Sequence, residues 1–311
     1  MINLNPINQT KLFCLDKYIS KLIRLFDIGK FPNKLLLTGQ KGIGKSTLAY
    51  HLVNYILSLD EEFCYNKINF QINLKNHSYK TILNKSNPNL LVLDILIDKK
   101  TIDISQVREL IMKLNKSSFN TKPRFVLIDN IEFLNKNSIN ALLKVIEEPN
   151  FNIHFILINN NNKKILPTLI SRCINYKIFL TNEESLKVAN FLLEDQLENK
   201  ISNDLINYYS TPGNIFNLVL FGDLNKFNLK DLNLKQFLKI IIKENYYKKD
   251  TLIKPMIFDL IEFYFRKINY SFSSNINKKY SYFLKRISDT KKFNLDEESL
   301  FIDFDEEILN G

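Results

Sequence analysis

The chain has 311 residues, 45% of them hydrophobic, which is enough for two or three domains with real cores. It has no run of 18 apolar residues and no secretory signal pattern, which excludes a membrane-spanning class and leads us to expect a cytoplasmic protein without a membrane partner. The net charge of +10 suits a protein that works beside a polyanion such as nucleic acid, although the abundance of Lys, Asn and Ile explains the same charge equally well.

The three cysteines, Cys14, Cys64 and Cys173, are far apart in the sequence and show no C-x-x-C spacing. This pattern argues against a disulfide framework and against a tetrahedral zinc site. We therefore expect reduced, mostly buried thiols, and no zinc in this protein.

The first half of the chain alternates helical and strand patterns. The predicted elements, in chain order, are a helix at 17–29, a strand at 35–39, a helix at 45–59, a strand at 90–96, a helix at 105–118, a strand at 125–129, a helix at 137–148 and a strand at 155–159. The strands are continuous apolar runs, which is typical of strands covered on both faces of a parallel sheet. Alternation with short connections predicts an α/β fold with a parallel sheet through about residue 178.

The pattern becomes almost entirely helical after residue 178. Thr181, followed three residues later by Glu184, forms a capping-box signature before an amphipathic run. A Thr-Pro-Gly break at 211–213 precedes a low-complexity polar segment that suggests a boundary near residue 224. The predicted domains are an α/β domain and two helical domains, at 1–178, 179–224 and 225–311.

The most specific motif is GQKGIGKS, which fits G-x-x-x-x-G-K-[ST]. Its glycines let the loop turn backbone N–H groups toward phosphates, Lys45 offers a charge to the β- and γ-phosphates, and the Ser46 hydroxyl can ligate magnesium. The motif follows a predicted strand and opens a helix, whose dipole adds positive potential, and this context disfavours a glycine turn without a ligand. We predict that ATP or ADP with Mg²⁺ binds at Gly39, Gln40, Lys41, Gly42, Ile43, Gly44, Lys45, Ser46 and Thr47.

The segment RFVLIDNIEFLN ends a hydrophobic strand in Asp129. A carboxylate there can hold Mg²⁺ through its water shell, so Ser46 and Asp129 are the predicted magnesium ligands. Asn130 then occupies the position where a second carboxylate commonly follows. An amide cannot accept a proton, so general-base help, typically worth about 10²–10⁴-fold, is expected to be lost. Glu132, three residues on, would have to act from a different part of the turn.

Three segments, at 29–49, 124–150 and 154–173, resemble the successive motifs of the bacterial clamp-loader subunits of the AAA+ family. The combination of N-A-L-L-K-x-x-E-E-P with a later S-R-C is far more specific than a phosphate loop alone. The resemblance is close for residues 10 to about 178. It implies a P-loop AAA+ module, a small helical lid and an all-α collar domain, which correspond to the three domains predicted above.

The same resemblance implies a ring of five subunits that opens the sliding clamp and places it on primed DNA during replication. The implied partners are gamma/tau motor subunits and a delta subunit, with the clamp reached indirectly and primer–template DNA as a candidate contact. The S-R-C arginine, Arg172, is implied to reach the γ-phosphate bound by the neighbouring subunit as an arginine finger. A guanidinium there stabilises charge that develops on the transferring phosphoryl group.

Several positions depart from the pattern of hydrolysing family members. Asn214 stands where active members carry a lid arginine, and Asn130 replaces the catalytic glutamate. The family's sensor position, a polar residue at the end of the fourth strand that can hydrogen-bond a phosphate or water, falls on Asn159 or Asn160. Asn160 is the predicted nucleotide contact. The interpretation is a subunit that binds nucleotide but hydrolyses it weakly or not at all. The alternative is an autonomous AAA+ ATPase, such as a gamma/tau-like motor subunit or another DNA-acting enzyme.

Overall fold

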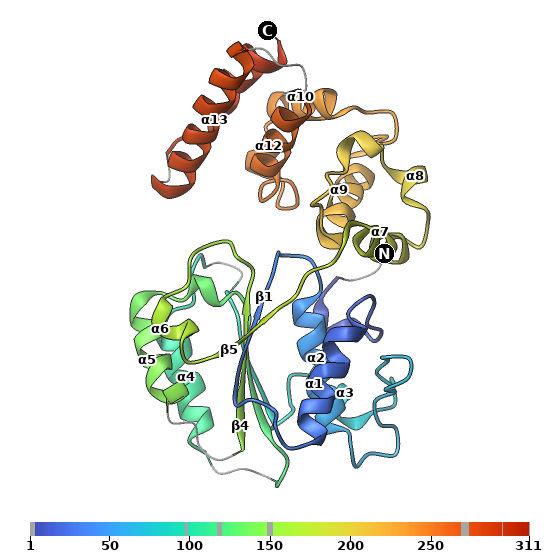
Figure 1. Cartoon of the computed structure of the whole chain (residues 1–311), viewed down its shortest axis with the longest axis vertical. Coiled ribbons are helices and arrows are strands. Elements are labelled where there is room, and N and C mark those ends of the chain that lie inside the picture. The colour runs from blue at the N-terminus through green and yellow to red at the C-terminus, as the bar shows by residue number, and fades with distance from the viewer. Residues whose placement is uncertain are drawn as a thin grey trace. The chain divides into compact units, whose positions relative to one another are not determined.

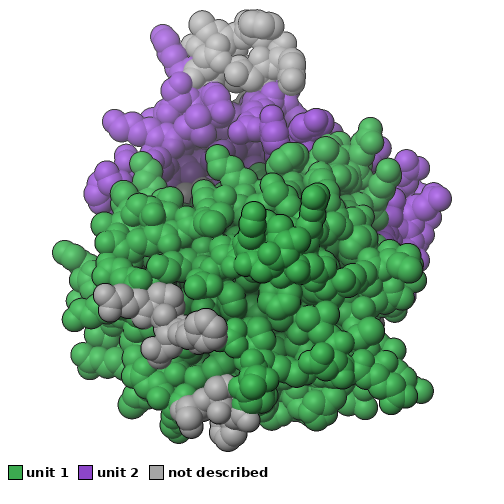
Figure 2. Space-filling model, turned by 60° about the horizontal axis from the view of Figure 1, so that its bottom comes forward, with its two compact units in different colours: residues 1–188 green, residues 189–311 purple. Residues whose placement is uncertain are grey.

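The computed structural model describes residues 4–96, 99–116, 120–147, 152–268, 274–293 and 295–310. The chain divides into two compact units, residues 1–188 and 189–311, which are coloured separately in Figure 2. The prediction of three domains with boundaries at 178 and 224 is finer than this division, and it stays a prediction. Within the described residues, no helix combines the length and the hydrophobicity that crossing a bilayer requires.

Unit 1 alternates helices and strands, as the sequence predicts. Its elements are η1 (Pro6–Asn8), α1 (Asp16–Asp27), β1 (Lys34–Thr38), α2 (Lys45–Leu57), α3 (His77–Leu83), β2 (Leu90–Leu93), α4 (Ile104–Leu114), β3 (Arg124–Ile128), η2 (Ile131–Phe133), α5 (Lys136–Glu147), β4 (Ile153–Asn159), α6 (Pro167–Ile170), β5 (Ile174–Lys177) and the first half of α7 (Asn182–Leu193). The α/β class and the parallel sheet are confirmed.

The sheet of unit 1 has five parallel strands in the order β2-β3-β4-β1-β5. Helices α1, α2 and α3 lie on one face of it, and α4, α5 and α6 lie on the other (Figure 1). Both faces of the central strands are therefore covered, and every residue of β4 is buried. Because the strands run parallel, the C-terminal ends of β1, β3 and β4 lie side by side at one end of the sheet. The candidate site is assembled from the residues that follow these strands.

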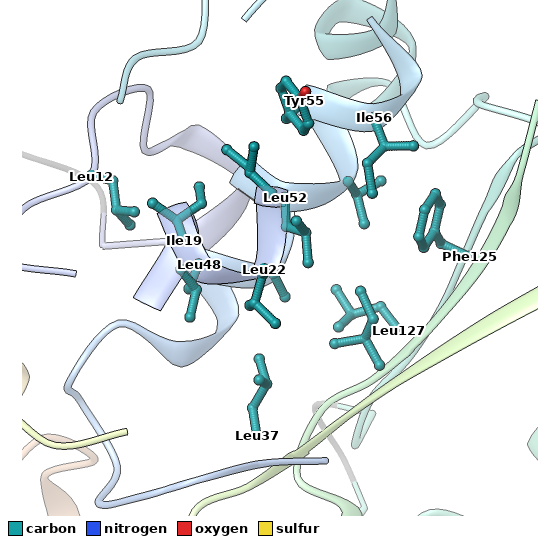
Figure 3. Close-up of a cluster of buried hydrophobic side chains, with 14 of the residues drawn as sticks. Leu12, Ile19, Leu22, Leu37, Leu48, Leu52, Tyr55, Ile56, Phe125 and Leu127 are labelled. Atoms are coloured by element: carbon teal, nitrogen blue, oxygen red, sulfur yellow. The ribbon is translucent and has the colours of Figure 1, made fainter. Parts of the chain in front are cut away.

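Alternate residues of each strand enter two different cores. Leu37 of β1 and Leu127 of β3 pack with Leu48 and Leu52 of α2 in one core, part of which Figure 3 shows. Leu36, the neighbour of Leu37, faces the opposite core with α4 and α5. A strand with an apolar layer on both sides needs an unbroken apolar run, which explains the sequence pattern.

Unit 2 is helical. Its elements after α7 are α8 (Leu197–Lys200), η3 (Asn203–Leu205), α9 (Pro212–Asn225), α10 (Leu234–Lys243), α11 (Tyr246–Lys249), α12 (Ile257–Ile268), α13 (Ser274–Phe293), α14 (Glu297–Phe304) and the π-helical turn η5 (Asp305–Leu309). Its core contains fully buried aromatic rings, with Phe265 and Phe304 centred 5.5 Å apart. The predicted capping box of α7 is confirmed, because Thr181 N donates to Glu184 Oε2 at 2.8 Å and Glu184 N donates to Thr181 Oγ1 at 3.2 Å.

The three cysteines are free thiols, but the expectation that they are mostly buried is wrong. Cys64 is exposed, while Cys14 and Cys173 are half-buried. Burial raises the pKa of Cys173 to about 11, so this thiol stays protonated at neutral pH.

His51 lies in the middle of α2 and is fully buried. Its Nε2 lies 3.0 Å from the carbonyl oxygen of Gln9, which can only accept, so Nε2 carries the proton. Its Nδ1 lies 3.0 Å from the Tyr65 hydroxyl and accepts from it. Burial lowers the pKa of His51 from 6.5 to about 4, with the Gln9 hydrogen bond opposing this shift.

This depressed pKa predicts acid sensitivity of unit 1. The unfolded chain binds a proton near pH 6.5 and the folded chain does so only near pH 4, so stability is lost as the pH falls between these values. From pH 7 to 4.5 we expect the free energy of unfolding to fall by about 2 kcal/mol more in the wild type than in His51→Gln. Urea titrations at both pH values measure this. The exposed His77 offers the control, since His77→Gln should keep the wild-type difference.

Candidate nucleotide site

The loop between β1 and α2 has a backbone that requires glycine. Gly44, the N-cap of α2, has a φ of 89°, in the left-handed region. At Gly39, an added Cβ would lie 2.4 Å from the carbonyl oxygen of Ile178, which no real side chain tolerates. The loop therefore passes close to the segment after β5 and then delivers the N-terminus of α2 to the sheet edge. Oriented N–H groups at a helix N-terminus favour an anion.

Lys45 is the first residue of α2, and it is buried, with 3% of its surface exposed. Its Nζ donates to the carbonyl oxygens of Gly39 at 2.9 Å and Gln40 at 2.6 Å. Burial lowers the pKa of Lys45 to about 8, although the negative charges of Asp129 and Glu132 raise it in part. The ammonium group is thus held inside the loop, where a P-loop lysine neutralises phosphates.

Ser46 and Asp129 are brought together from positions 83 residues apart in the chain. The Ser46 hydroxyl donates to Asp129 Oδ2. Asp129 directly follows β3, and its backbone N–H donates to the carbonyl of Leu93 at the end of β2, at 2.9 Å. A hydroxyl and a carboxylate are oxygen ligands of the kind that Mg²⁺ prefers, so this pair fits the predicted metal.

Asn130 sits in the left-handed region, with a φ of 54°, and its side chain links two neighbouring strands. Its Nδ2 donates to Asp94 Oδ1 at 2.8 Å. Its Oδ1 accepts from Asn160 Nδ2 at 2.9 Å, and the same Asn160 amide lies 3.4 Å from Asp129 Oδ1. The predicted sensor residue Asn160 is therefore joined to both Asp129 and Asn130.

Asp94 is the functional candidate that sequence reasoning missed. It directly follows β2, which ends at Leu93 and not at Leu96 as predicted, so it stands after its strand as Asp129 stands after β3. The signal in the sequence is an aspartate inside the apolar run 90–96. Burial raises the pKa of Asp94, and the charge of Asp129 raises it further, whereas the Asn130 hydrogen bond lowers it. The site thus has an acid after β2 and an amide at the position after Asp129.

Glu132 is buried and forms hydrogen bonds with the loop that follows β4. Its carboxylate accepts from the backbone N–H of Asn160 at 3.1 Å and from Asn162 Nδ2 at 3.1 Å. These bonds support the interpretation that Glu132 holds the loop after β4 and does not replace the acid at position 130. The other sensor candidate, Asn159, is also buried, and its amide donates to Asn161 Oδ1 at 2.8 Å.

A cavity of about 490 Å³ opens beside the first residues of the loop and touches Gly39, Gln40 and Ile43. Its polar wall includes Thr38, whose hydroxyl donates to Asn175 Oδ1 at 2.7 Å. Neither Lys45 nor Ser46 lines it. The predicted phosphate site is therefore described by the hydrogen bonds of Lys45 and Ser46 and not by this cavity.

Arg172 is the one predicted site residue that the structure places far from the others. It lies between α6 and β5, and β5 starts beside Leu35 at the beginning of β1. The phosphate loop starts at Gly39, four residues further along, or about 13 Å at 3.3 Å per residue. Arg172 and the predicted phosphate loop therefore lie near opposite ends of the strands, and the Arg172 side chain is 37% exposed.

Comparison with known proteins identifies the family. A family model described as "DNA polymerase III, delta subunit" matches residues 15–181. DNA polymerase III subunit delta' of Buchnera aphidicola subsp. Schizaphis graminum is 28% identical over 266 residues, which cover 80% of this chain and 76% of that protein. Subunit gamma of the same organism is 30% identical over 180 residues, which cover 57% of this chain and 46% of that protein.

Among solved structures, a gamma subunit-related protein of Thermotoga maritima aligns with a TM-score of 0.49 and 19% identity, covering 91% of this chain and 96% of that one. The family model alone spans more than half of the chain. The predicted membership of the bacterial clamp-loader AAA+ proteins is confirmed: the chain belongs to the family described as DNA polymerase III, delta subunit, and is similar to its delta' members.

Proposed function

We propose that this chain is a delta'-like clamp-loader subunit that binds ATP or ADP with Mg²⁺, hydrolyses it weakly or not at all, and supplies Arg172 to a neighbouring motor subunit. The observation that carries this proposal is the set of side chains at the C-terminal ends of the strands. Lys45, Ser46 and Asp129 provide a complete set for holding a nucleotide, while Asn130 provides an amide where a catalytic acid is needed.

Binding is supported by the charge and the donors of the loop. A bound Mg²⁺ nucleotide would supply the phosphoryl group, and this chain's residues would hold it. Lys45 would exchange its bonds to two loop carbonyls for phosphate oxygens, which form stronger, charge-assisted hydrogen bonds. Ser46 and Asp129 would ligate the metal, directly and through its water shell.

Weak hydrolysis is supported by the bonds of Asn130. Its amide donates to Asp94 and accepts from Asn160, so both ends of the side chain are engaged. An amide has no basic lone pair with which to take a proton from an attacking water. Asn130 therefore holds Asp94 and Asn160 in place at the ends of their strands but does not activate a nucleophile.

Contact of Arg172 with a neighbouring subunit is supported by its position near the end of the strands opposite to its own phosphate loop. A guanidinium so far from its own phosphate loop can meet a triphosphate only on another chain. In the proposed ring of five, the gamma/tau motor subunits would receive it and a delta subunit would complete the assembly. The ring would then load the sliding clamp on primed DNA during replication.

The test is a coupled ATPase assay on the purified chain, alone and mixed with gamma/tau motor subunits. We expect almost no turnover by the chain alone and turnover that depends on assembly in the mixture. Appreciable turnover alone, abolished by Lys45→Ala, would instead favour an autonomous ATPase. Mass spectrometry of nucleotide retained through purification identifies the ligand that the chain holds.

Lys45→Ala should weaken nucleotide binding. Loss of a charge-assisted hydrogen bond, worth about 1.5–3 kcal/mol, predicts an affinity for Mg²⁺-ADP lower by about 10- to 100-fold. Calorimetric titration of the purified chain measures this change. Lys80→Ala, which removes an exposed lysine from α3 of the same unit, should leave the affinity unchanged. Equal affinities for the two variants would show that the loop is not the binding site.

A further inference from the structure

The Arg172 guanidinium is bound on two sides within its own chain. Its Nε and Nη2 each lie 2.8 Å from Glu147 Oε1, and its Nη1 donates to the carbonyl oxygen of Thr168 at 2.9 Å. Glu147 is the last residue of α5, and Thr168 lies in α6. Two helices of the same core thus fix the plane of an otherwise half-exposed side chain.

These contacts leave part of the guanidinium for another ligand. Arginine has five N–H donors, and the contacts among the described residues engage three of them. One donor on Nη1 and one on Nη2 remain. Two donors on a planar guanidinium are what an oxyanion such as phosphate binds through paired hydrogen bonds.

Glu147 occupies a position that is locally unfavourable for an acid. It lies in the last turn of α5, two residues before Pro149, near the negative end of the helix dipole, which disfavours a carboxylate. Two cations offset this, because Arg172 binds its side chain and Lys34 Nζ donates to its backbone carbonyl at 3.3 Å. The following Glu148 of the same sequence motif lies outside the described residues. The contact with Arg172 therefore stabilises a carboxylate that the helix alone would disfavour.

We propose that Glu147 is a positioning residue that holds Arg172 in the orientation in which it meets the triphosphate of the neighbouring subunit. This inference depends on the proposed function of Arg172. A long arginine side chain loses rotamer freedom when it binds, and a contact that fixes it beforehand removes that cost from the encounter. The pair is half-exposed, so its contribution to stability is small, and its effect lies in orientation.

The first test observes the ion pair in the isolated chain. The sequence contains six arginines, so the ¹⁵N–¹H signal of Arg172 Nε can be assigned by its loss in Arg172→Lys. We expect slower hydrogen exchange of this N–H in the wild type than in Glu147→Gln, which keeps the shape but removes the charge. Glu109→Gln is the matched control, because Glu109 is an exposed acid on α4 that pairs with Lys113 at 2.7 Å.

The second test measures ATP hydrolysis by the reconstituted ring. Glu147→Gln should lower kcat by about tenfold, as a misplaced catalytic group does. KM for ATP should stay unchanged, because the motor subunit's own loop binds the nucleotide. In an Arg172→Ala background, Glu147→Gln should cause no further loss, which a merely structural role would not predict.

Four outcomes would overturn the inference. Unchanged exchange of the Arg172 Nε–H in Glu147→Gln would show that the pair does not form in solution, and a higher kcat would show that Glu147 restrains the finger. An unchanged ring with Glu147→Gln alone would remove the positioning role and leave the proposed function standing. An unchanged ring with Arg172→Ala would remove the proposed function and this inference with it.

Discussion

Replacement of Arg172 by alanine should lower ATP hydrolysis at the motor site that it serves by about 10³-fold or more. An arginine that contacts the transferring phosphoryl group from another subunit stabilises charge that exists only in the transition state, and such residues are worth about 10³–10⁵ in kcat. Nucleotide binding by this chain should not change, because Arg172 lies at the opposite edge of the sheet from its own loop. Single-turnover hydrolysis by the reconstituted ring measures the loss.

Assembly must be measured in the same samples, because a subunit that fails to join the ring would also lower turnover. Native mass spectrometry should find the same complex with Arg172→Ala as with the wild type. Arg24→Ala, which removes an exposed arginine from the last turn of α1, is the matched control and should leave hydrolysis intact. A fully assembled Arg172→Ala ring with wild-type turnover would exclude the trans role.

Much of the fold could be predicted because the apolar pattern of each strand indicates whether helices cover one or both faces of the sheet. β1, β3 and β4 each contain an unbroken run of apolar residues, since alternate residues such as Leu36 and Leu37 enter opposite cores. The edge strand β5 was not predicted. Its residues, Ile174–Lys177, are mostly exposed and carry no apolar run, and they are a strand only because β1 offers them a free edge.

The glycine-rich loop between β1 and α2 could be predicted from the sequence because its residues are neighbours in the chain and its backbone requires glycine at Gly39 and Gly44. The pairing of Asp94 with Asn130 could not be predicted in this way. These residues are 36 positions apart, and they meet only because the sheet order places β2 next to β3. Glu147 and Arg172 likewise meet through packing of α5 and α6 on the same face, which no motif spacing encodes.

The proposed absence of a catalytic acid at position 130 predicts that introducing glutamate there alone will not produce an efficient ATPase. Asn130→Glu would add a carboxylate beside Asp94 and Asp129, where burial and charge already raise the pKa of Asp94. The residue also has a φ of 54°, which asparagine adopts more readily than glutamate. We expect this variant to lose about 1–3 kcal/mol of stability, measured by urea unfolding, and to gain little hydrolysis.

The double variant Asn130→Glu with Asp94→Asn should keep its stability and gain hydrolysis. It exchanges the acid and the amide between positions 94 and 130, so that the two positions still carry one of each. The asparagine at 94 could donate to the new carboxylate, as Asn130 now donates to Asp94. With a base restored, hydrolysis by this chain should rise by about 10²–10⁴-fold over the wild type. A ring whose motor subunits carry inactivated phosphate loops isolates this turnover, and adding Lys45→Ala should abolish it. If the double variant binds ATP and joins the ring but shows no turnover, the missing acid is not what limits hydrolysis, and Asn214, in place of the lid arginine, becomes the position to change next.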